Sequence, residues 1–441
     1  MKISVIGCGY LGAVHATALA SLGHEVVGYD IDPARIEALA SGRAPFFEPG
    51  LDALLNELVS TDRLRFTNQV ADTAGAAIHF IAVGTPQSSD GDAADLTFVH
   101  AALDALIPHL RPGDLVVGKS TVPVGTAASL ATRLAESAPG AILAWNPEFL
   151  REGFAIADTL SPDRLVYGLP ARDVDAERAE ALLDEVYRDA LAAGTPKVVT
   201  NYETAELVKV AANAFLATKI SFINAMAEVS EIVGADVTQL ADALGHDARI
   251  GRRFLNAGIG FGGGCLPKDI RAFAARAEEL GAGQALGFLR EVDAINLRRR
   301  TRVADLAEEL LGGDVRDRSI TVLGVTFKPD SDDVRDSPAL DVADLLHRRG
   351  ARVTVTDPQG LPNAARRNPE LRIEPSVSAA LNGAELVVLA TEWKDYTELD
   401  PATARSEVGP SVDHPTVIDA RNALQPDQWR AAGWTYRGLG R

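Results

Sequence analysis

The chain has 441 residues, 46% hydrophobic and 24% charged, an ordinary globular composition with enough apolar residues for two or three domains. The formal net charge of −18 argues against a nucleic-acid partner, because a surface that follows a phosphate backbone needs an excess of Lys and Arg. The two cysteines lie far apart in the sequence, which argues against a disulfide framework and favours a reducing compartment.

The N-terminus leads directly into a predicted first strand, so we expect no signal peptide. No apolar run approaches the roughly 18 residues that span a bilayer. We therefore expect a cytoplasmic protein without a membrane partner.

Residues 1 to about 195 alternate between short apolar runs and segments of helical period, which predicts a parallel sheet with helices on both faces. The expected strands are Ile3–Ile6, Glu25–Tyr29, Ile78–Val83, Leu115–Gly118 and Ile142–Trp145, and the expected helices lie near Leu11–Leu22, Pro33–Ala40, Leu51–Val59, Phe98–Leu110 and Thr126–Ser137.

A glycine-rich turn, Gly7-Cys-Gly9-Tyr-Leu-Gly12, follows the first strand and opens a helix. Its glycines suit a tight turn, close approach to a pyrophosphate and close packing of helix on strand. Asp30 closes the second strand, where its carboxylate would accept hydrogen bonds from ribose hydroxyls and repel a 2′-phosphate. This favours NAD over NADP, although the nearby cation Arg35 weakens the argument. A glycine-rich turn that binds nothing is the less favoured alternative, and Cys8 is expected to be structural.

Three further loops follow strands and are therefore expected to line the ligand crevice of the parallel sheet. They are Val83-Gly84-Thr85-Pro86, Ser120 to Gly125 and Asn146 to Glu152. Taken singly, each of the first two fits an ordinary turn. The third contributes Glu148 and Glu152, which either handle protons near the nicotinamide or are merely exposed at a helix start.

Apolar residues recur at three- and four-residue steps between Tyr202 and Gly234, which predicts one long helix. Lys209 and Asn213 share a face of this helix, and the apolar neighbours of Lys209 raise the chance that it is buried and functional. A second helical stretch is expected from Gln284 to Leu311. The helical middle is expected to supply a homodimer surface, unless it is buried against its own neighbours.

Cys265 lies in the segment Phe261-Gly-Gly-Gly-Cys-Leu-Pro-Lys-Asp269. Its glycines let the backbone approach a ligand, Lys268 favours the thiolate, and Asp269 is placed to orient or deprotonate a water. A lone cysteine is more often a small buried hydrophobe, but this setting favours a nucleophile.

Strand and helix signals alternate again after Gly313, with expected strands Ile320–Val325, Arg352–Thr356, Leu386–Ala390 and Thr416–Ile418. This predicts a second, smaller doubly wound domain that lacks the dinucleotide turn. The predicted fold is thus two doubly wound α/β domains, residues 1–198 and 313–441, joined by a helical region, 199–312. No metal is expected.

These motifs, in this order and spacing, resemble the UDP-glucose/GDP-mannose dehydrogenase family over nearly the whole chain. The resemblance implies oxidation of the 6-hydroxymethyl group of a nucleotide sugar to a carboxylate with two NAD per turnover. Cys265 would form a thiohemiacetal and then a thioester that water hydrolyses. Lys209 and Asn213 would stabilise the oxyanion, Asp269 would activate water and Glu148 would transfer protons.

The resemblance also implies which residues bind the ligands. The cofactor set is Gly7, Gly9, Tyr10, Leu11, Gly12, Asp30, Arg35, Val83, Gly84, Thr85, Thr121 and Glu152, and Thr121 also has a catalytic role. The substrate set is Glu148, Phe149, Leu150, Lys209, Asn213, Arg249, Phe254, Leu255, Asn256, Gly258, Gly262, Phe327, Lys328 and Arg421, with Arg249 reaching the site of a neighbouring subunit.

Residues 249–262 resemble the UDP-glucose branch of the family, whereas the GDP-mannose and UDP-N-acetylhexosamine branches are the alternatives. Gly264 and Asn256 depart from residues common among relatives, but neither removes a group that the mechanism needs. A two-electron dehydrogenase of the 3-hydroxyacid type would leave Cys265 and the C-terminal domain unexplained. A non-enzymatic NAD-sensing protein would leave Lys209 and Asp269 unexplained.

Overall fold

The computed structural model describes residues 1–441, which form two compact units. The N-terminal unit comprises Met1–Ala212 and Ala275–Gly281, and the C-terminal unit comprises Asn213–Ala274 and Ala282–Arg441. Helices α9 (Tyr202–Val233) and α11 (Leu266–Glu279) each have residues in both units.

The N-terminal unit is built on an eight-stranded sheet of order β3-β2-β1-β4-β5-β6-β7-β8. Its strands are β1 (Lys2–Ile6), β2 (Glu25–Tyr29), β3 (Leu64–Thr67), β4 (Ile78–Ile81), β5 (Leu115–Gly118), β6 (Ile142–Trp145), β7 (Leu165–Gly168) and β8 (Lys197–Thr200). All pairs are parallel except β6 with β7, so the predicted all-parallel sheet is wrong at that one step.

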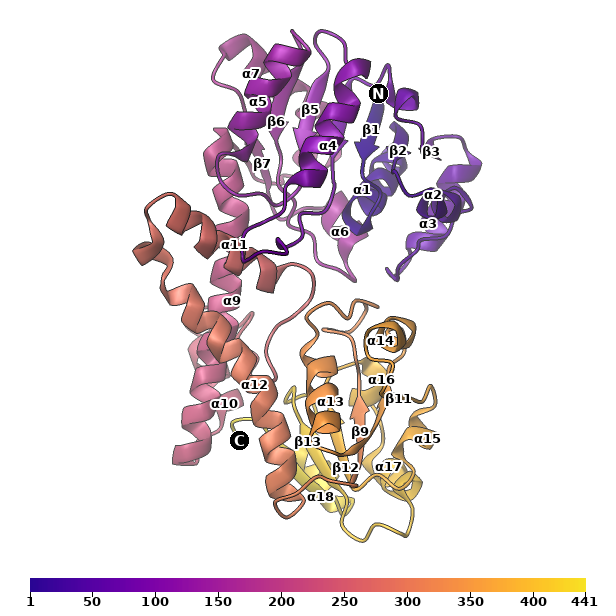
Figure 1. Cartoon of the computed structure of the whole chain (residues 1–441), viewed down its shortest axis with the longest axis vertical. Helices are drawn as coiled ribbons and strands as arrows, with labels where there is room; N and C mark the ends of the chain where they lie inside the picture. Colours follow the sequence, from indigo (N-terminus) through magenta and orange to yellow (C-terminus); the bar gives the residue numbers. More distant parts are fainter. The chain divides into compact units, whose positions relative to one another are not determined.

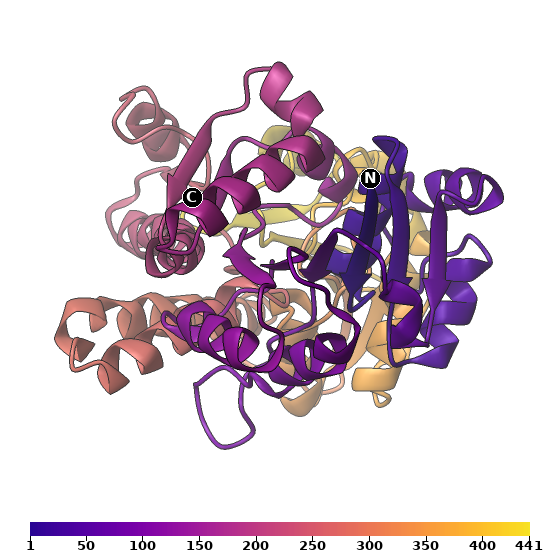
Figure 2. The same cartoon turned by 90° about the horizontal axis from the view of Figure 1, so that it is seen from above.

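Helices cover both faces of this sheet (Figures 1 and 2). They are α1 (Tyr10–Ser21), α2 (Pro33–Ala40), α3 (Leu51–Ser60), α4 (Thr97–Leu106), α5 (Thr126–Ser137), α6 (Ala155–Leu160), α7 (Asp173–Val186), α8 (Arg188–Ala192) and the short 3₁₀ helices η1 (Val70–Thr73) and η2 (Ile107–His109). One core packs α1, α3 and α7 on one face, and another packs α4, α5 and the start of α9 on the other. The central strands are buried on both faces, which explains their uninterrupted apolar sequences.

The strand order reverses between β1 and β4, and ligands of such sheets bind beyond the carboxyl ends of the strands at this point. The glycine turn follows β1, and the other three predicted ligand loops follow β4, β5 and β6. The topology therefore brings the four predicted cofactor segments to one edge of one sheet.

The middle of the chain is helical, with α9, α10 (Val237–Gly245), α11, η3 (Gly283–Leu286) and α12 (Phe288–Leu310). The predicted long helix is confirmed. The predicted stretch Gln284–Leu311 is instead a 3₁₀ turn followed by α12, with Gly287 between them. Residues 246–265 are irregular, so this region is not helical throughout.

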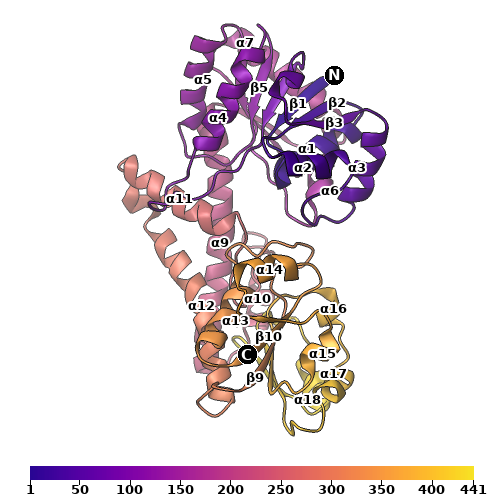
Figure 3. The same ribbon diagram turned by 45° about the vertical axis from the view of Figure 1, so that its right-hand side comes forward.

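The C-terminal unit contains a six-stranded parallel sheet of order β11-β10-β9-β12-β13-β14 (Figure 3). Its elements are β9 (Ser319–Leu323), α13 (Pro338–Arg348), β10 (Arg352–Thr356), α14 (Leu361–Arg367), β11 (Arg372–Ile373), α15 (Val377–Leu381), β12 (Leu386–Leu389), α16 (Lys394–Thr397), α17 (Pro401–Val408), β13 (Thr416–Asp419), α18 (Pro426–Ala431) and β14 (Thr435–Gly438). One core packs against α12 and α13, and another includes residues of α16, α17 and α18. The predicted fold class is confirmed.

By length and composition alone, α9 would be able to cross a membrane. The core helix of a soluble protein meets the same criteria, and 44% of the most apolar stretch of α9 is buried.

Candidate active site

The glycine turn has the backbone geometry that a dinucleotide needs. Gly7 has φ +91°, and a Cβ at Gly12 would lie 1.7 Å from the Gly7 carbonyl oxygen, so these two positions exclude side chains. A Cβ at Gly9, in contrast, would meet nothing within 4 Å. Gly9 is the N-cap of α1 and has no side chain to cap the helix. The turn therefore leaves a helix N-terminus open to a pyrophosphate, which fits NAD.

Asp30 closes β2 and is buried beside this turn. Its carboxylate accepts from the Cys8 backbone N–H at 2.7 Å and pairs with Arg35 Nη1 at 2.9 Å. The predicted ribose acceptor and Arg35 are thus direct neighbours. Cys8 is fully buried, and burial raises the pKa of its thiol, so the predicted structural role fits its surroundings.

Tyr10 connects the glycine turn to the loop that contains Glu152. The Tyr10 hydroxyl donates to the buried carboxylate of Glu48, which also accepts from the backbone N–H groups of Gly153 at 2.7 Å and Ala155 at 2.8 Å. Glu48 was not predicted as a site residue. It lies in an irregular loop, and its partners Tyr10, Gly153 and Ala155 are 38, 105 and 107 residues away in the sequence.

The loops after β4 and β5 are joined by two hydroxyl groups. Thr85 Oγ1 donates to the Thr121 carbonyl at 2.8 Å, and Ser120 Oγ donates to the Val83 carbonyl at 2.7 Å. The structure therefore brings together Val83, Thr85 and Thr121 of the predicted cofactor set.

Lys209 and Glu148 form a buried ion pair, with Lys209 Nζ 2.9 Å from Glu148 Oε1. The expectation that Lys209 is buried is confirmed. Lys209 Nζ and the Arg164 guanidinium lie 5.7 Å and 3.8 Å from the centre of the Phe149 ring, which adds cation–π contacts. Arg164 was missed in the sequence, where it looks like an ordinary charged residue before a strand.

A second buried lysine, Lys119, lines a pocket together with Glu148 and Phe149. Its Nζ donates to Asn146 Oδ1 at 3.0 Å and to the Tyr187 hydroxyl at 3.2 Å. Burial lowers the pKa of Lys119 to about 8, while the negative charge of Glu148 acts in the opposite direction. Around Glu148 the N-terminal unit thus concentrates positive charge.

The C-terminal unit holds the other predicted catalytic residues. Asn213 Nδ2 donates to the buried carboxylate of Asp269 at 2.7 Å, and Lys268 Nζ lies 2.5 Å from the other oxygen of Asp269. Cys265 is exposed and immediately precedes α11, whose first turn contains Lys268 and Asp269. A helix N-terminus favours an anion, so this position favours a thiolate.

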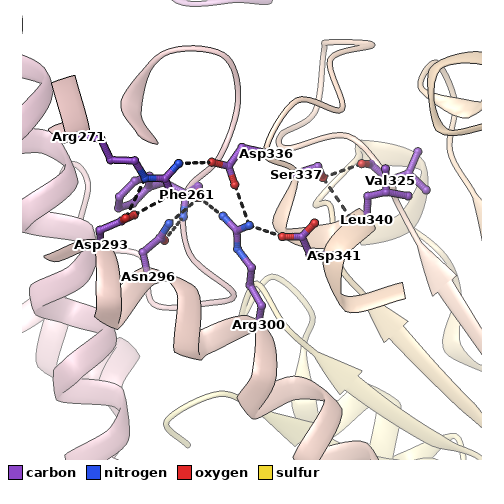
Figure 4. Close-up of polar contacts among 10 residues, drawn as sticks. All are labelled: Phe261, Arg271, Asp293, Asn296, Arg300, Val325, Asp336, Ser337, Leu340 and Asp341. Atoms are coloured by element: carbon purple, nitrogen blue, oxygen red, sulfur yellow. Dashed lines mark hydrogen bonds and ion pairs between the residues drawn. The ribbon is translucent and has the colours of Figure 1, made fainter. Parts of the chain in front are cut away.

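The glycine-rich segment before Cys265 is held rigidly by buried polar groups (Figure 4). Asn296 accepts from the Phe261 N–H at 2.7 Å and donates to the Phe261 carbonyl at 3.0 Å. Arg300 donates to the same carbonyl at 3.2 Å. A Cβ at Gly260 would lie 2.1 Å from Asn296 Oδ1, so glycine is required for this close approach.

Asp336 extends this network to the loop before α13 (Figure 4). Its carboxylate pairs with Arg300 at 2.8 Å and with Arg271 of α11 at 3.4 Å, while Arg271 also pairs with Asp293 at 2.9 Å. A Cβ at Gly262 would lie 2.1 Å from the Asp336 carbonyl oxygen. Within the C-terminal unit, the cysteine segment is therefore fixed to the doubly wound sheet.

Arg421, which follows β13, binds three backbone carbonyls. Its donors reach Ala390 at 2.8 Å, Gly260 at 3.0 Å and Phe327 at 3.0 Å. Lys328 lies over the Phe327 ring, 5.4 Å from its centre. Arg421 and Phe327 thus lie beside the glycine segment, since a Cβ at Gly263 would meet the Phe327 ring at 2.8 Å.

The remaining predicted substrate residues precede Cys265 in the irregular stretch after α10. Phe254 has the unusual φ of +66°, Leu255 is buried and Asn256 accepts from Arg252 at 2.7 Å. A Cβ at Gly258 would lie 2.7 Å from the Ala420 carbonyl oxygen. The Arg249 side chain is 89% exposed and pairs with Asp247.

Four of the six predicted catalytic residues thus form two pairs, Lys209 with Glu148 and Asn213 with Asp269. Lys209 and Asn213 lie one turn apart on α9, at the border of the two units. The structure contains no group of three or more His, Cys, Asp and Glu side chains able to hold a metal ion.

The models for the UDP-glucose/GDP-mannose dehydrogenase family match the chain in three segments. The NAD binding domain matches residues 1–191, the central domain residues 203–298 and the UDP binding domain residues 321–426.

Named relatives match the chain over its full length. UDP-glucose 6-dehydrogenase TuaD of Bacillus subtilis (strain 168) is 40% identical, and the match covers 100% of this chain and 93% of the relative. UDP-glucose 6-dehydrogenase of Rhizobium meliloti (strain 1021) is 41% identical, with 100% of each chain covered. A solved UDP-glucose dehydrogenase from the hyperthermophilic archaeon Pyrobaculum islandicum superposes with a TM-score of 0.89 at 40% identity, covering 100% of this chain and 97% of that chain.

Proposed function

Because the chain belongs to the UDP-glucose/GDP-mannose dehydrogenase family, we propose that it oxidises UDP-glucose to UDP-glucuronate in two NAD-dependent steps. NAD, when bound, accepts one hydride in each oxidation. The observation that carries the proposal is the exposed Cys265 thiol at the start of α11, with the Asn213–Asp269 pair on the adjoining elements. A dehydrogenase that stops at an aldehyde needs no such thiol.

In the first half of the reaction, the 6-hydroxymethyl group loses a proton and a hydride and becomes an aldehyde. The Cys265 thiolate then adds to the aldehyde carbon and forms a thiohemiacetal. Lys209 stabilises the developing oxyanion, and Asn213 assists as a hydrogen-bond donor. Glu148 transfers protons, a role supported by its contact with Lys209, which places the carboxylate beside the proposed oxyanion donor.

In the second half, the thiohemiacetal loses a second hydride from its carbon and the proton from its hydroxyl group, and becomes a thioester. Water adds to the thioester carbonyl, the carbon–sulfur bond breaks, and the products are the carboxylate and the Cys265 thiol. Asp269 positions or activates this water, and its contact with Asn213 Nδ2 fixes the direction of its carboxylate.

The number of NADH molecules formed per sugar tests this function. With limiting UDP-glucose and excess NAD, we expect two NADH per sugar and an acidic sugar as product, measured by absorbance and mass spectrometry. One NADH per sugar with release of an aldehyde would contradict the proposal. GDP-mannose and UDP-N-acetylhexosamines, assayed in parallel, test the choice of branch within the family.

We also propose that α9 forms a homodimer interface in a cytoplasmic enzyme. Exposed apolar side chains follow one side of the helix at steps of seven and four residues, namely Phe215, Phe222, Val229 and Val233. A stripe of this kind is costly to leave in water. The exposed Arg249 fits the expectation that it reaches the site of a second copy.

Replacing Phe222 with Glu tests the dimer. We expect the variant to be a monomer by light scattering and to lose most of its activity, because a charge in an apolar interface is poorly solvated. Val174→Glu is the control, since Val174 is also apolar and exposed but lies on α7. A Phe222→Glu variant that remains dimeric would exclude this face as the interface.

A further inference from the structure

Helix α5 lacks a cap of its own because its N-cap residue is Gly125. The missing cap comes from Glu206 in the first turns of α9. Glu206 is 1% exposed, and its two carboxylate oxygens accept from the backbone N–H groups of Gly125 at 2.7 Å and Ala127 at 2.6 Å. A buried carboxylate with both oxygens committed to one helix start is a strong, directional restraint.

The loop before α5 is held by groups on two different helices. Arg276, in the last turn of α11, donates from Nε to the Val124 carbonyl at 3.0 Å, next to the amides bound by Glu206. At the other end of the loop, the Thr121 carbonyl accepts from Thr85. The segment from Thr121 to Gly125 is therefore restrained at both ends.

The two restraining helices also carry predicted catalytic residues. On α9, Lys209 follows Glu206 by three residues, and α11 begins directly after Cys265. A shift of the loop against Glu206 would therefore change the position of Thr121 relative to the helix that carries Lys209.

We propose that Glu206 is a positioning residue that holds the Thr121–Gly125 loop in the conformation that binds NAD, and that this hold weakens when Glu206 takes up a proton. The inference rests on the proposed function only in taking the loop to be part of the cofactor site.

The protonation of Glu206 falls within the physiological range. Burial raises the pKa of Glu206 to about 7, although the Gly125 and Ala127 amides favour the ionised form. Because this folded-state pKa is above the ordinary value, Glu206 is ionised above about pH 7 and protonated below it. A protonated oxygen is a poor acceptor, so one of the two loop contacts weakens as the pH falls through 7.

Two charged groups shift the pKa of Glu206 in opposite directions and therefore provide matched controls. Glu203, exposed on the same helix, raises its pKa, whereas Arg276 of α11 lowers it. NAD binding should therefore change with pH around the pKa of Glu206. Glu203→Gln should move this pH transition to lower pH without altering the loop contacts. Arg276→Gln should move it to higher pH, in addition to weakening the Val124 contact.

The experiment measures NAD binding without sugar, by calorimetry from pH 6 to 8.5, together with hydrogen exchange of the peptide that contains residues 120–127. Loss of one net hydrogen bond predicts about fivefold weaker binding at pH 6 than at pH 8 in the unaltered protein. In Glu206→Gln we expect weaker binding at pH 8, faster exchange of the loop after correction for intrinsic rates, and no transition near pH 7.

The shifts of the pH transition in NAD binding distinguish a positioning role of Glu206 from a general loss of stability. Opposite shifts in Glu203→Gln and Arg276→Gln support the proposal. An unchanged transition in Glu206→Gln, or identical transitions in both control variants, would overturn it. Because no sugar is present, failure of UDP-glucose oxidation would not affect this result.

Discussion

Cys265→Ser is expected to abolish formation of the acid while leaving NAD binding unchanged. A serine hydroxyl is not ionised at neutral pH and is a poor nucleophile without an adjacent base, so no covalent adduct would form with the aldehyde. We expect the turnover to fall by at least about 10³-fold, as is typical when a catalytic nucleophile is removed. Cys265 is exposed in the C-terminal unit, so the substitution leaves the glycine turn of the N-terminal unit intact.

Calorimetric NAD binding and the number of NADH molecules formed per site check this prediction. Thiol alkylation offers an independent control that needs no variant. Cys8 is fully buried, and burial raises the pKa of its thiol, so iodoacetamide should label Cys265 alone and stop turnover with one label per chain. Near-normal turnover in Cys265→Ser, or in the singly labelled protein, would remove the covalent step from the mechanism.

The sequence predicts those features that depend on local pattern. Two of the three glycines of the first turn, Gly7 and Gly12, have steric reasons that the structure displays, and buried parallel strands appear as continuous apolar runs. Lys209 was predicted to be buried because its neighbours on α9 are apolar. Among the strands that the sequence did not predict, β8 lacks such a pattern, because it is four residues long and exposes both Val198 and Val199.

Residues whose partners are distant in the sequence could not be predicted in the same way. Glu48 and Glu206 look like ordinary glutamates in the sequence, yet each caps a helix about 80 to 107 residues away. The N-cap residues of the two helices, Phe154 and Gly125, make no side-chain cap. The need for a distant cap can therefore be recognised only once the helix starts are known. Packing of loops after neighbouring strands, rather than any local motif, creates the need for these carboxylates.

Asp269→Asn is expected to separate the oxidation steps from hydrolysis. The substitution keeps the size of the side chain but removes the charge that we propose activates water. The thioester on Cys265 should still form, whereas its hydrolysis should slow by about 10²- to 10⁴-fold, the usual contribution of a general base. Mixing enzyme with NAD and UDP-glucose should therefore give a rapid burst of two NADH per site followed by a slow phase.

Intact-protein mass spectrometry during the slow phase should detect the acyl group on the protein. Lys268→Met is the control, because it removes the partner 2.5 Å from Asp269 but keeps the carboxylate. If Lys268 stabilises the Cys265 thiolate, this variant should slow the burst of NADH and accumulate no acyl-enzyme. A uniformly slow Asp269→Asn variant without a burst would mean that Asp269 acts before the thioester. The buried contact with Asn213 would then orient the oxyanion donor rather than a water.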